Sequence, residues 1–263
     1  MTIPFFKYQG AGNDFILIDQ RARTFLTRQD ADRVAALCDR RFGIGADGLM
    51  LLQEAEGADF EMIYFNADGG VSTLCGNGSR CIAAFARRLG IIDRHCTFLA
   101  ADGPHEAVIR PETGWVELKM NDVRQIETTD SAVILNTGSP HYVVFVDNLK
   151  EMDINASGRS VRYSDRFNRE GINVNFAELS DDGLNVATYE RGVESETLSC
   201  GTGVTAAALA RYIRHPDGQP AAVVRISTKG GNLEVRFRPQ NGGFTDIWLC
   251  GPATFVFEGR IDG

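Results

Sequence analysis

The two halves of this chain carry the same motifs in the same order. Cys75–Gly78 (CGNG) returns 125 residues later as Cys200–Gly203 (CGTG), and the turn and strand of Gly10–Asp19 return 128 residues later at Gly138–Asp147. Two shorter matches lie between them: Arg41–Ile44 with Asn168–Ile172, and Tyr64 with Tyr189. A nearly constant offset indicates the duplication of one unit. Duplication predicts two pseudo-symmetric domains, with the active site in the cleft between them.

The pattern of predicted elements is α+β, with more strand than helix. Short β-branched and aromatic runs, such as Asp59–Phe65 and Leu233–Arg238, recur between turn residues. Ala-rich apolar runs predict two helices, Gly76–Leu89 and Gly201–Arg214, the second stopped by Pro216.

A polar, apolar-poor stretch at Asp122–Ser131 marks the expected boundary between the domains. We expect an N-terminal domain over residues 1–125, completed by a C-terminal strand at about 253–263, and a C-terminal domain over residues 126–252.

Each repeated cysteine stands at the start of a predicted helix. Gly-x-Gly follows Cys75 and Cys200 directly, so the backbone can approach a ligand closely there. A thiol at a helix N-terminus has its thiolate stabilised, so it can act as a base near neutral pH. The free N–H groups of the first helical turn also favour a substrate carboxylate.

Two such thiols on opposite walls of a cleft predict epimerisation with two bases. One thiolate removes the proton alpha to a carboxylate, and the opposite thiol delivers a proton to the other face. Donors aimed at the carboxylate stabilise the negative charge that develops. For one such cysteine the alternative, a small buried residue at a turn, would be preferred; the repetition favours the catalytic interpretation.

Composition excludes several other classes of function. The net charge of −8 and the absence of a basic stripe argue against a nucleic-acid partner. The N-terminus lacks the features of a signal peptide, and no apolar run is long enough to span a bilayer, so we expect a cytoplasmic protein without a membrane partner. Six cysteines without C-x-x-C spacing, and four scattered histidines, predict neither a disulfide framework nor a metal site.

With these motifs in place, the chain resembles the diaminopimelate epimerase family along its whole length. The matching segments are Gly10–Asp14, Gly43–Gly48, Phe65–Gly69, Cys75–Arg80, Pro140–His141, Asn173–Phe176, Glu190–Gly192, Glu196–Thr197, Cys200–Gly203 and Gly251–Ala253. The resemblance implies two similar domains, each a mixed β-sheet wrapped around a central helix. It also implies interconversion of LL- and meso-diaminopimelate for lysine and peptidoglycan precursors, no cofactor, and a homodimer.

The resemblance further implies roles for individual residues. Cys75 is the proton donor and Cys200 the acceptor in one direction, and His141 with Glu190 helps to set thiol protonation. Glu190 and Arg191 hold the distal, non-reacting centre of the amino-acid substrate. The full set of expected substrate-binding residues is Asn13, Asn66, Gly76, Asn77, Asn173, Glu190, Arg191, Gly201 and Thr202. Without the resemblance, His141 would be taken as structural and the asparagines as turn caps.

Two positions depart from some family members. Gly48 stands where some carry Gln, and Ser139 where some carry Asn. Gly48 has no side chain for a substrate contact, and Ser139 has a shorter reach than Asn.

Three alternatives remain open at this point. A histidine or proline racemase would use the same scaffold and, for proline, the same two thiols, but would not need the Glu190–Arg191 clamp. An isomerase of the phenazine-pathway type is disfavoured because that group does not retain both cysteines. A binding protein or a thiol redox sensor using Cys75 and Cys200 belongs to a different class of function.

Overall fold

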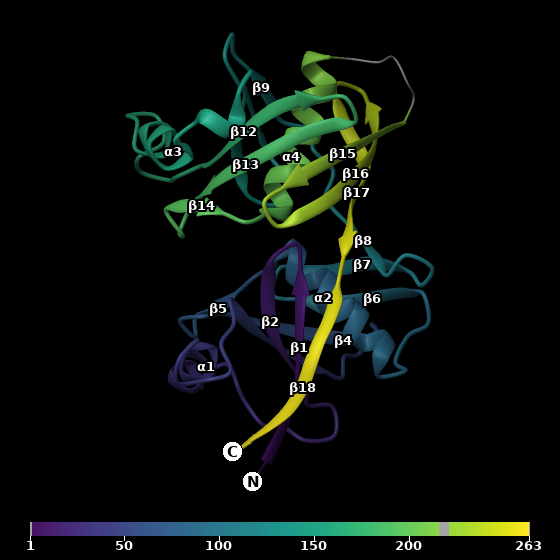
Figure 1. Ribbon diagram of the computed structural model, residues 1–263. Coiled ribbons are helices and arrows are strands. Elements are labelled where there is room, and N and C mark those ends of the chain that lie inside the picture. Colours follow the sequence, from purple (N-terminus) through teal and green to yellow (C-terminus); the bar gives the residue numbers. More distant parts are fainter. Residues whose placement is uncertain (1, 216–220, 263) are drawn as a thin grey trace. The chain divides into compact units, whose positions relative to one another are not determined.

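The computed structural model describes residues 2–215 and 221–262 and divides into two compact units (Figure 1). Unit 1 comprises the described residues up to Leu118 together with those from Gly251 onward, and unit 2 runs from Lys119 to Cys250. The chain therefore passes from unit 1 to unit 2 and back.

Unit 1 is built on one mixed sheet in the order β18-β1-β2-β3-β4-β6-β7-β8, with the short β5 paired to β4. The β2–β3 and β4–β6 pairs are parallel, and the other pairs are antiparallel. Its strands are β1 (Thr2–Gly10), β2 (Asn13–Asp19), β3 (Gly48–Gln53), β4 (Phe60–Asn66), β5 (Val71–Ser72), β6 (His95–Ala100), β7 (Gly103–Arg110), β8 (Trp115–Lys119) and β18 (Thr254–Asp262).

The sheet of unit 1 surrounds helix α2 (Gly76–Arg88), which contacts β1, β2, β3, β7 and β18. Ile82 and Phe85 on this helix are fully buried. The chain leaves the helix at Gly90, whose φ of +73° suits glycine. A shorter helix, α1 (Ala31–Cys38), packs against β3 with Val34 and Cys38 buried.

Unit 2 repeats the arrangement, with the sheet order β9-β10-β11-β12-β13-β15-β16-β17 and β14 paired to β13. The β11–β12 and β13–β15 pairs are parallel. Its strands are β9 (Ile126–Thr128), β10 (Val133–Asn136), β11 (Pro140–Phe145), β12 (Asn173–Ser180), β13 (Gly183–Glu190), β14 (Ser195–Thr197), β15 (Ala222–Thr228), β16 (Gly231–Gln240) and β17 (Gly243–Pro252).

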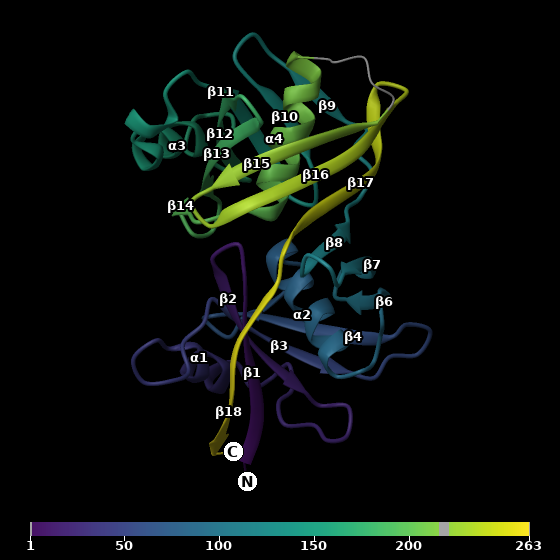
Figure 2. The same cartoon turned by 45° about the vertical axis from the view of Figure 1, so that its right-hand side comes forward.

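The central helix of unit 2 is α4 (Gly201–Arg214), which β15 and β16 cross in Figure 2 and which contacts these two strands as well as β11, β12 and β13. Pro216, the expected stop, lies outside the described residues. The 3-10 turn η1 (Leu149–Glu151) precedes helix α3 (Ile154–Arg162), which packs on β12, β13 and β14. Asp153 caps α3 by accepting a hydrogen bond from Ala156 N.

The two units match element by element, which confirms the expected α+β fold from an internal duplication. Strands β1 to β8 correspond to β10 to β17, helices α1 and α2 to α3 and α4, and the outer strands β18 and β9 to each other. Residues 119–125, from the last residue of β8 to the residue before β9, belong to unit 2. No helix among the described residues has the length and apolar character to cross a membrane.

Candidate active site

Cys75 occupies the N-cap position of α2 in unit 1. Its backbone is extended (φ −119°, ψ 117°), its carbonyl accepts a hydrogen bond from Ser79 N at 2.7 Å, and the residue is half-buried. Cys81, deeper in the same helix, is in a different setting. Burial raises the pKa of the Cys81 thiol to about 12, so this thiol stays protonated at neutral pH.

Cys200 occupies the same position in unit 2, at the N-cap of α4. Its backbone angles (φ −115°, ψ 112°) nearly equal those of Cys75, and its carbonyl accepts from Val204 N at 2.9 Å. The Sγ atom lies 3.5 Å from Oγ1 of Thr202, and the residue is 8% exposed. The duplication has therefore placed both thiols at helix N-termini of the same kind.

The amides of unit 1 form a chain that starts in α2. Nη2 of the buried Arg80 donates to Oδ1 of Asn77 at 2.8 Å, and Nδ2 of Asn77 donates to Oδ1 of Asn13 at 2.6 Å. Nδ2 of Asn13 in turn donates to a carboxylate oxygen of Asp47 at 3.0 Å. Arg80 Nη1 also donates to Gly76 O at 3.3 Å. These hydrogen bonds give each amide a defined orientation. They also connect the first turn of α2, which follows Cys75, to Asn13 at the start of β2.

A cluster of charged side chains surrounds Asp47, the last residue of this hydrogen-bonded series. Arg40 bridges Asp14 and Asp47 at 2.6 and 2.7 Å, and Lys7 pairs with Asp14 at 2.7 Å. Burial alone would raise the pKa of Asp14, but the hydrogen bonds from Arg40 and Lys7 outweigh it and lower this pKa to about 2. Asp14 is therefore ionised at neutral pH and anchors the turn that carries Asn13.

Strand register brings the remaining candidates of unit 1 to one end of the sheet. Asn13 begins β2, Gly48 begins the parallel β3 opposite Phe15, and Asn66 ends the antiparallel β4 opposite Gly48. Asn66 is exposed, and its backbone N–H donates to Gly70 O at 2.9 Å in the following turn.

Gly48 is a glycine for a steric reason. A Cβ at this position would lie 2.5 Å from the carbonyl oxygen of Phe65 and 2.7 Å from the ring of Tyr64. The backbone of β4 leaves no room for the Gln that some family members carry here.

His141 lies at the start of β11, opposite Asn173, and is completely buried. Burial, and next the positive charge of Arg191, lower the pKa of His141 to about 3, so the ring is neutral at physiological pH. Its Nδ1 lies 3.0 Å from Nδ2 of Asn175. Its Nε2 has no hydrogen-bond partner among the described residues.

Both the nitrogen and the oxygen of the Asn173 side-chain amide form hydrogen bonds with other residues of the protein. Nδ2 donates to Ser139 Oγ at 2.9 Å and to Pro140 O at 3.2 Å, and Oδ1 accepts from Arg191 N at 2.8 Å. The guanidinium of Arg191 reaches Ser139 Oγ at 3.3 Å and Glu170 O at 3.1 Å. Ser139, which stands where some family members carry Asn, thus accepts hydrogen bonds from both the Asn173 amide and the Arg191 guanidinium.

The remaining candidates of unit 2 lie at the end of β13 and the start of α4. Glu190, the last residue of β13, is half-buried and accepts a hydrogen bond from Thr197 Oγ1 at 3.0 Å. The carbonyl of Thr202 accepts from Thr137 Oγ1 at 2.8 Å, which ties the first turn of α4 to the loop before β11.

The structure therefore gathers the candidates into two half-sites, each made of a helix N-terminus and the neighbouring strand ends of one unit. Sequence reasoning missed polar residues that position them, notably Arg80, Asp47, Thr188 and Asn175. One signal was available: Asn173 and Asn175 stand two residues apart, and so on one face of the strand, in a stretch whose neighbouring residues Val174, Phe176 and Ala177 are apolar.

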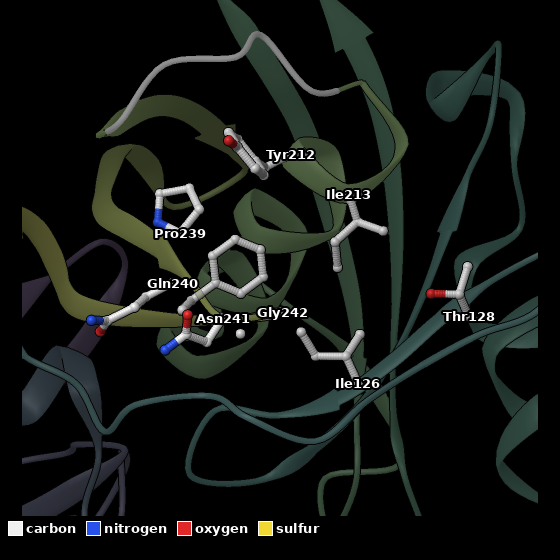
Figure 3. Close-up of a pocket in the computed structure, with 10 residues that line it drawn as sticks. Ile126, Thr128, Tyr212, Ile213, Pro239, Gln240, Asn241 and Gly242 are labelled. Carbon is white, nitrogen blue, oxygen red and sulfur yellow. The ribbon is translucent and has the colours of Figure 1, made fainter.

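Unit 2 also contains a pocket of about 490 Å³ that is separate from the predicted site residues (Figure 3). Tyr212 and Ile213, near the C-terminal end of α4, form part of its wall, together with Ile126, Thr128, Pro239, Gln240, Asn241, Gly242, Gly243 and Phe244. Cys200 stands at the opposite end of the same helix, and no predicted site residue lines this pocket.

Comparisons with known proteins agree with the internal repeat. The family model described as diaminopimelate epimerase matches twice, over residues 5–126 and 133–256. A diaminopimelate epimerase of Flavobacterium psychrophilum is 49% identical, over 97% of this chain and 99% of the relative. One of Chlorobaculum tepidum is 41% identical, over 96% of this chain and 98% of the relative.

Among solved structures, a phenazine biosynthesis protein of the PhzF family from Bacillus anthracis superposes with a TM-score of 0.79. The match covers 99% of both chains at 16% sequence identity, so it shows the fold alone.

Proposed function

This chain belongs to the diaminopimelate epimerase family, and we propose that it is an isomerase that converts LL-diaminopimelate to meso-diaminopimelate for lysine and peptidoglycan precursors. One observation carries the proposal beyond the family match. Both CGxG motifs sit at the N-caps of equivalent helices in two copies of one fold. Epimerisation with two bases uses one proton acceptor and one proton donor, and the duplication supplies two thiols for these roles.

The reaction we propose uses Cys75 and Cys200 as the two bases, without a cofactor. The Cys200 thiolate accepts the alpha proton, and the electron pair of the C–H bond remains on the substrate as a carbanion delocalised into its carboxylate. The Cys75 thiol then donates its proton to the opposite face of the same carbon. Configuration inverts, Cys75 is left as thiolate and Cys200 as thiol, and the reverse reaction exchanges the roles.

The backbone amides of Gly76, Asn77, Gly201 and Thr202 support the carbanion step in this proposal. These residues form the first turns of α2 and α4, where the backbone N–H groups point out of the helix end. Negative charge that moves onto the substrate carboxylate during proton removal is stabilised by such donors, together with the helix dipole. Asn13 and Asn66 supply further amides at the adjoining strand ends.

The distal end of the substrate is assigned to Glu190 and Arg191. A carboxylate from Glu190 suits the distal ammonium group, and the guanidinium of Arg191 suits the distal carboxylate. Support comes from Asn173, which holds the Arg191 backbone, and from Ser139, which holds its side chain. Such a clamp is unnecessary for a proline racemase, and the full-length relatives named above do not favour that alternative.

A cytoplasmic homodimer completes the proposal. The family resemblance supports the dimer, and the proposed role in making lysine and peptidoglycan precursors supports the location. Light scattering on a size-exclusion column at micromolar concentration should give twice the chain mass of 28.8 kDa.

Deuterium uptake in D2O tests the chemistry. Purified protein with LL-diaminopimelate should form meso-diaminopimelate carrying solvent deuterium at one alpha carbon. Proton NMR and mass spectrometry measure this product. Cys75→Ala and Cys200→Ala should each lower epimerisation by about 10³-fold or more. Each variant keeps one base, so each should exchange the alpha proton of at most one epimer, and the two variants should differ in which.

Cys96→Ala provides the matched control, because Cys96 is a buried thiol of unit 1 on β6 whose pKa burial raises to about 12. This variant should retain epimerisation. No deuterium uptake by the unmodified protein, or full epimerisation by either single variant, contradicts the proposal. Higher activity after oxidation of the two cysteines would favour the redox sensor.

A further inference from the structure

A buried polar relay stands behind His141 in unit 2. Oγ1 of Thr188 donates to Oδ1 of Asn175 at 3.0 Å, and Nδ2 of Asn175 lies 3.0 Å from Nδ1 of His141. Nδ2 also donates to the carbonyl of Tyr142 at 3.3 Å. His141 and Asn175 are 0% exposed and Thr188 is 3% exposed. All three side chains therefore interact without competition from bulk water.

The hydrogen-bond partners in the relay allow only one placement of the hydrogens on Asn175 and His141. The Tyr142 carbonyl can only accept, so the NH2 end of the Asn175 amide must face Tyr142 and His141, and the Thr188 hydroxyl donates to the oxygen at the other end. Nδ1 of His141 must then accept. A neutral imidazole carries one proton, which must sit on Nε2. Nε2–H is then a buried donor without a partner among the described residues.

The duplication provides an internal comparison for this relay. In unit 1 a Cβ on Gly78 would meet Met50 Cε at 1.9 Å, whereas in unit 2 a Cβ on the equivalent Gly203 would meet Asn175 Oδ1 at 2.4 Å. Met50 and Asn175 thus occupy the same place beneath the central helix. The fold accepts an apolar residue there, so packing alone does not require the amide.

We propose that Asn175 and Thr188 are positioning residues that keep His141 in the Nε2–H tautomer. Both act through His141. For its catalytic consequence the inference rests on the proposed function: a neutral Nε2–H group can donate to a thiolate or a carboxylate in the Cys200 half-site. Asn175 lies on the same side of α4 as Cys200, since a Cβ placed on Gly203 would also be 3.2 Å from Cys200 Cβ.

The tautomer can be measured in the full chain without substrate. Two-bond proton–nitrogen NMR on protein with 15N-labelled histidine separates the protonated ring nitrogen from the unprotonated one. The His141 signals are assigned by their loss in His141→Gln, out of four histidines. Unmodified protein at pH 7.5 should show the proton on Nε2. A proton on Nδ1 would overturn the inference whether or not the protein is an epimerase.

Two variants test the relay itself. Asn175→Asp presents only acceptors to the ring, so the proton should move to Nδ1 or the ring should become doubly protonated. In the epimerase assay kcat should fall about 10²-fold with KM within about twofold, because the donor is lost but the substrate contacts remain. An Nε2–H signal that persists in Asn175→Asp would refute the assignment of Asn175.

Thr188→Val removes the hydroxyl that holds the amide, so an Nδ1–H signal should appear beside the Nε2–H signal, and Thr188→Ser should restore the single form. Thr205→Val is the matched control, because the buried Thr205 hydroxyl donates to Gly201 O at 2.9 Å within α4 and does not join the relay. Thr205→Val should leave the His141 signals unchanged. A Thr188→Val spectrum identical to that of the control would remove Thr188 from the proposal.

Discussion

At the scale of single residues, the two halves of the duplication have kept their thiols and changed what surrounds them. Near Cys75 the polar groups form a charged chain, from Arg80 through Asn77 and Asn13 to Asp47. Near Cys200 the counterpart of Asn13 is the neutral, buried His141. The two thiols thus share a backbone position but belong to units whose polar residues differ in charge.

The neutral His141 makes a prediction about stability and pH. Its pKa is about 3 in the folded protein, below the usual 6.5, so the unfolded chain binds a proton first as the pH falls. The contribution of the neutral His141 ring to the free energy of unfolding is complete above pH 6.5 and is lost progressively as the pH falls towards 3. Between pH 7 and 5.5 the free energy of unfolding should fall by about 1 kcal/mol more than in His141→Gln.

Urea unfolding at the two pH values measures this difference. The protein has two tryptophans, Trp115 in unit 1 and Trp248 in unit 2, so a Trp115→Phe background makes fluorescence report on the unit that contains His141. Equal pH dependence with and without His141 would show that the ring takes up its proton at the same pH in the folded and the unfolded protein.

At the scale of elements, the position of each cysteine depends on how closely its helix approaches the sheet. Gly78 in α2 and Gly203 in α4 make this approach possible, but they rest on different surfaces. Under Gly78 lies the flexible end of Met50, and under Gly203 lie Asn175 and Thr188, which are held by hydrogen bonds.

The two glycines should therefore respond differently to the same substitution. Gly203→Ala should lower the free energy of unfolding by about 2 kcal/mol, because neither Asn175 nor Thr188 can move without losing a buried hydrogen bond. Gly78→Ala should cost less than half as much, since Met50 can change rotamer and alanine favours the helix. Chemical denaturation of both variants measures the difference, and a larger loss for Gly78→Ala would show that Met50 is the more rigid neighbour.

At the scale of the whole molecule, the last strand belongs to the first unit. After leaving unit 2 at Cys250, the chain forms β18 and pairs with β1 from Thr2 to Gln9. Phe255 and Phe257 of this strand contact Tyr8 and Phe5 of β1 with ring centroids 5.6 and 5.9 Å apart. Unit 1 is complete only when the chain has been synthesised as far as this strand.

Truncation after Ala253 should consequently destabilise unit 1 and spare unit 2. Hydrogen exchange of β1 and β2 should become faster by about tenfold or more, because β1 loses one of its two neighbouring strands. Exchange in β12 and β13 should be unchanged. Mass spectrometry of peptic peptides separates these strands, and equal loss of protection in both units would mean that they unfold as one body.

The sequence by itself determined the repeat, the two helix starts and the family. These features are local: a cysteine, two glycines and an alanine-rich run predict a helix start from neighbouring residues alone, and their recurrence is visible without coordinates. Some elements had no such local signal. Strand β3 is buried on both faces and shows no alternation, and α3 is short and polar, with Gly158 where a Cβ would lie 2.3 Å from Tyr189.

Only the tertiary structure decided which polar groups meet. Asn173 and Asn175 read as two similar amides in one strand, yet one holds Ser139 and Arg191 while the other faces His141. The lack of space at Gly48 and the neutral state of His141 likewise depend on residues distant in the sequence. Burial and hydrogen-bond geometry are properties of the packed sheet and helix, because they arise when strands far apart along the chain become neighbours.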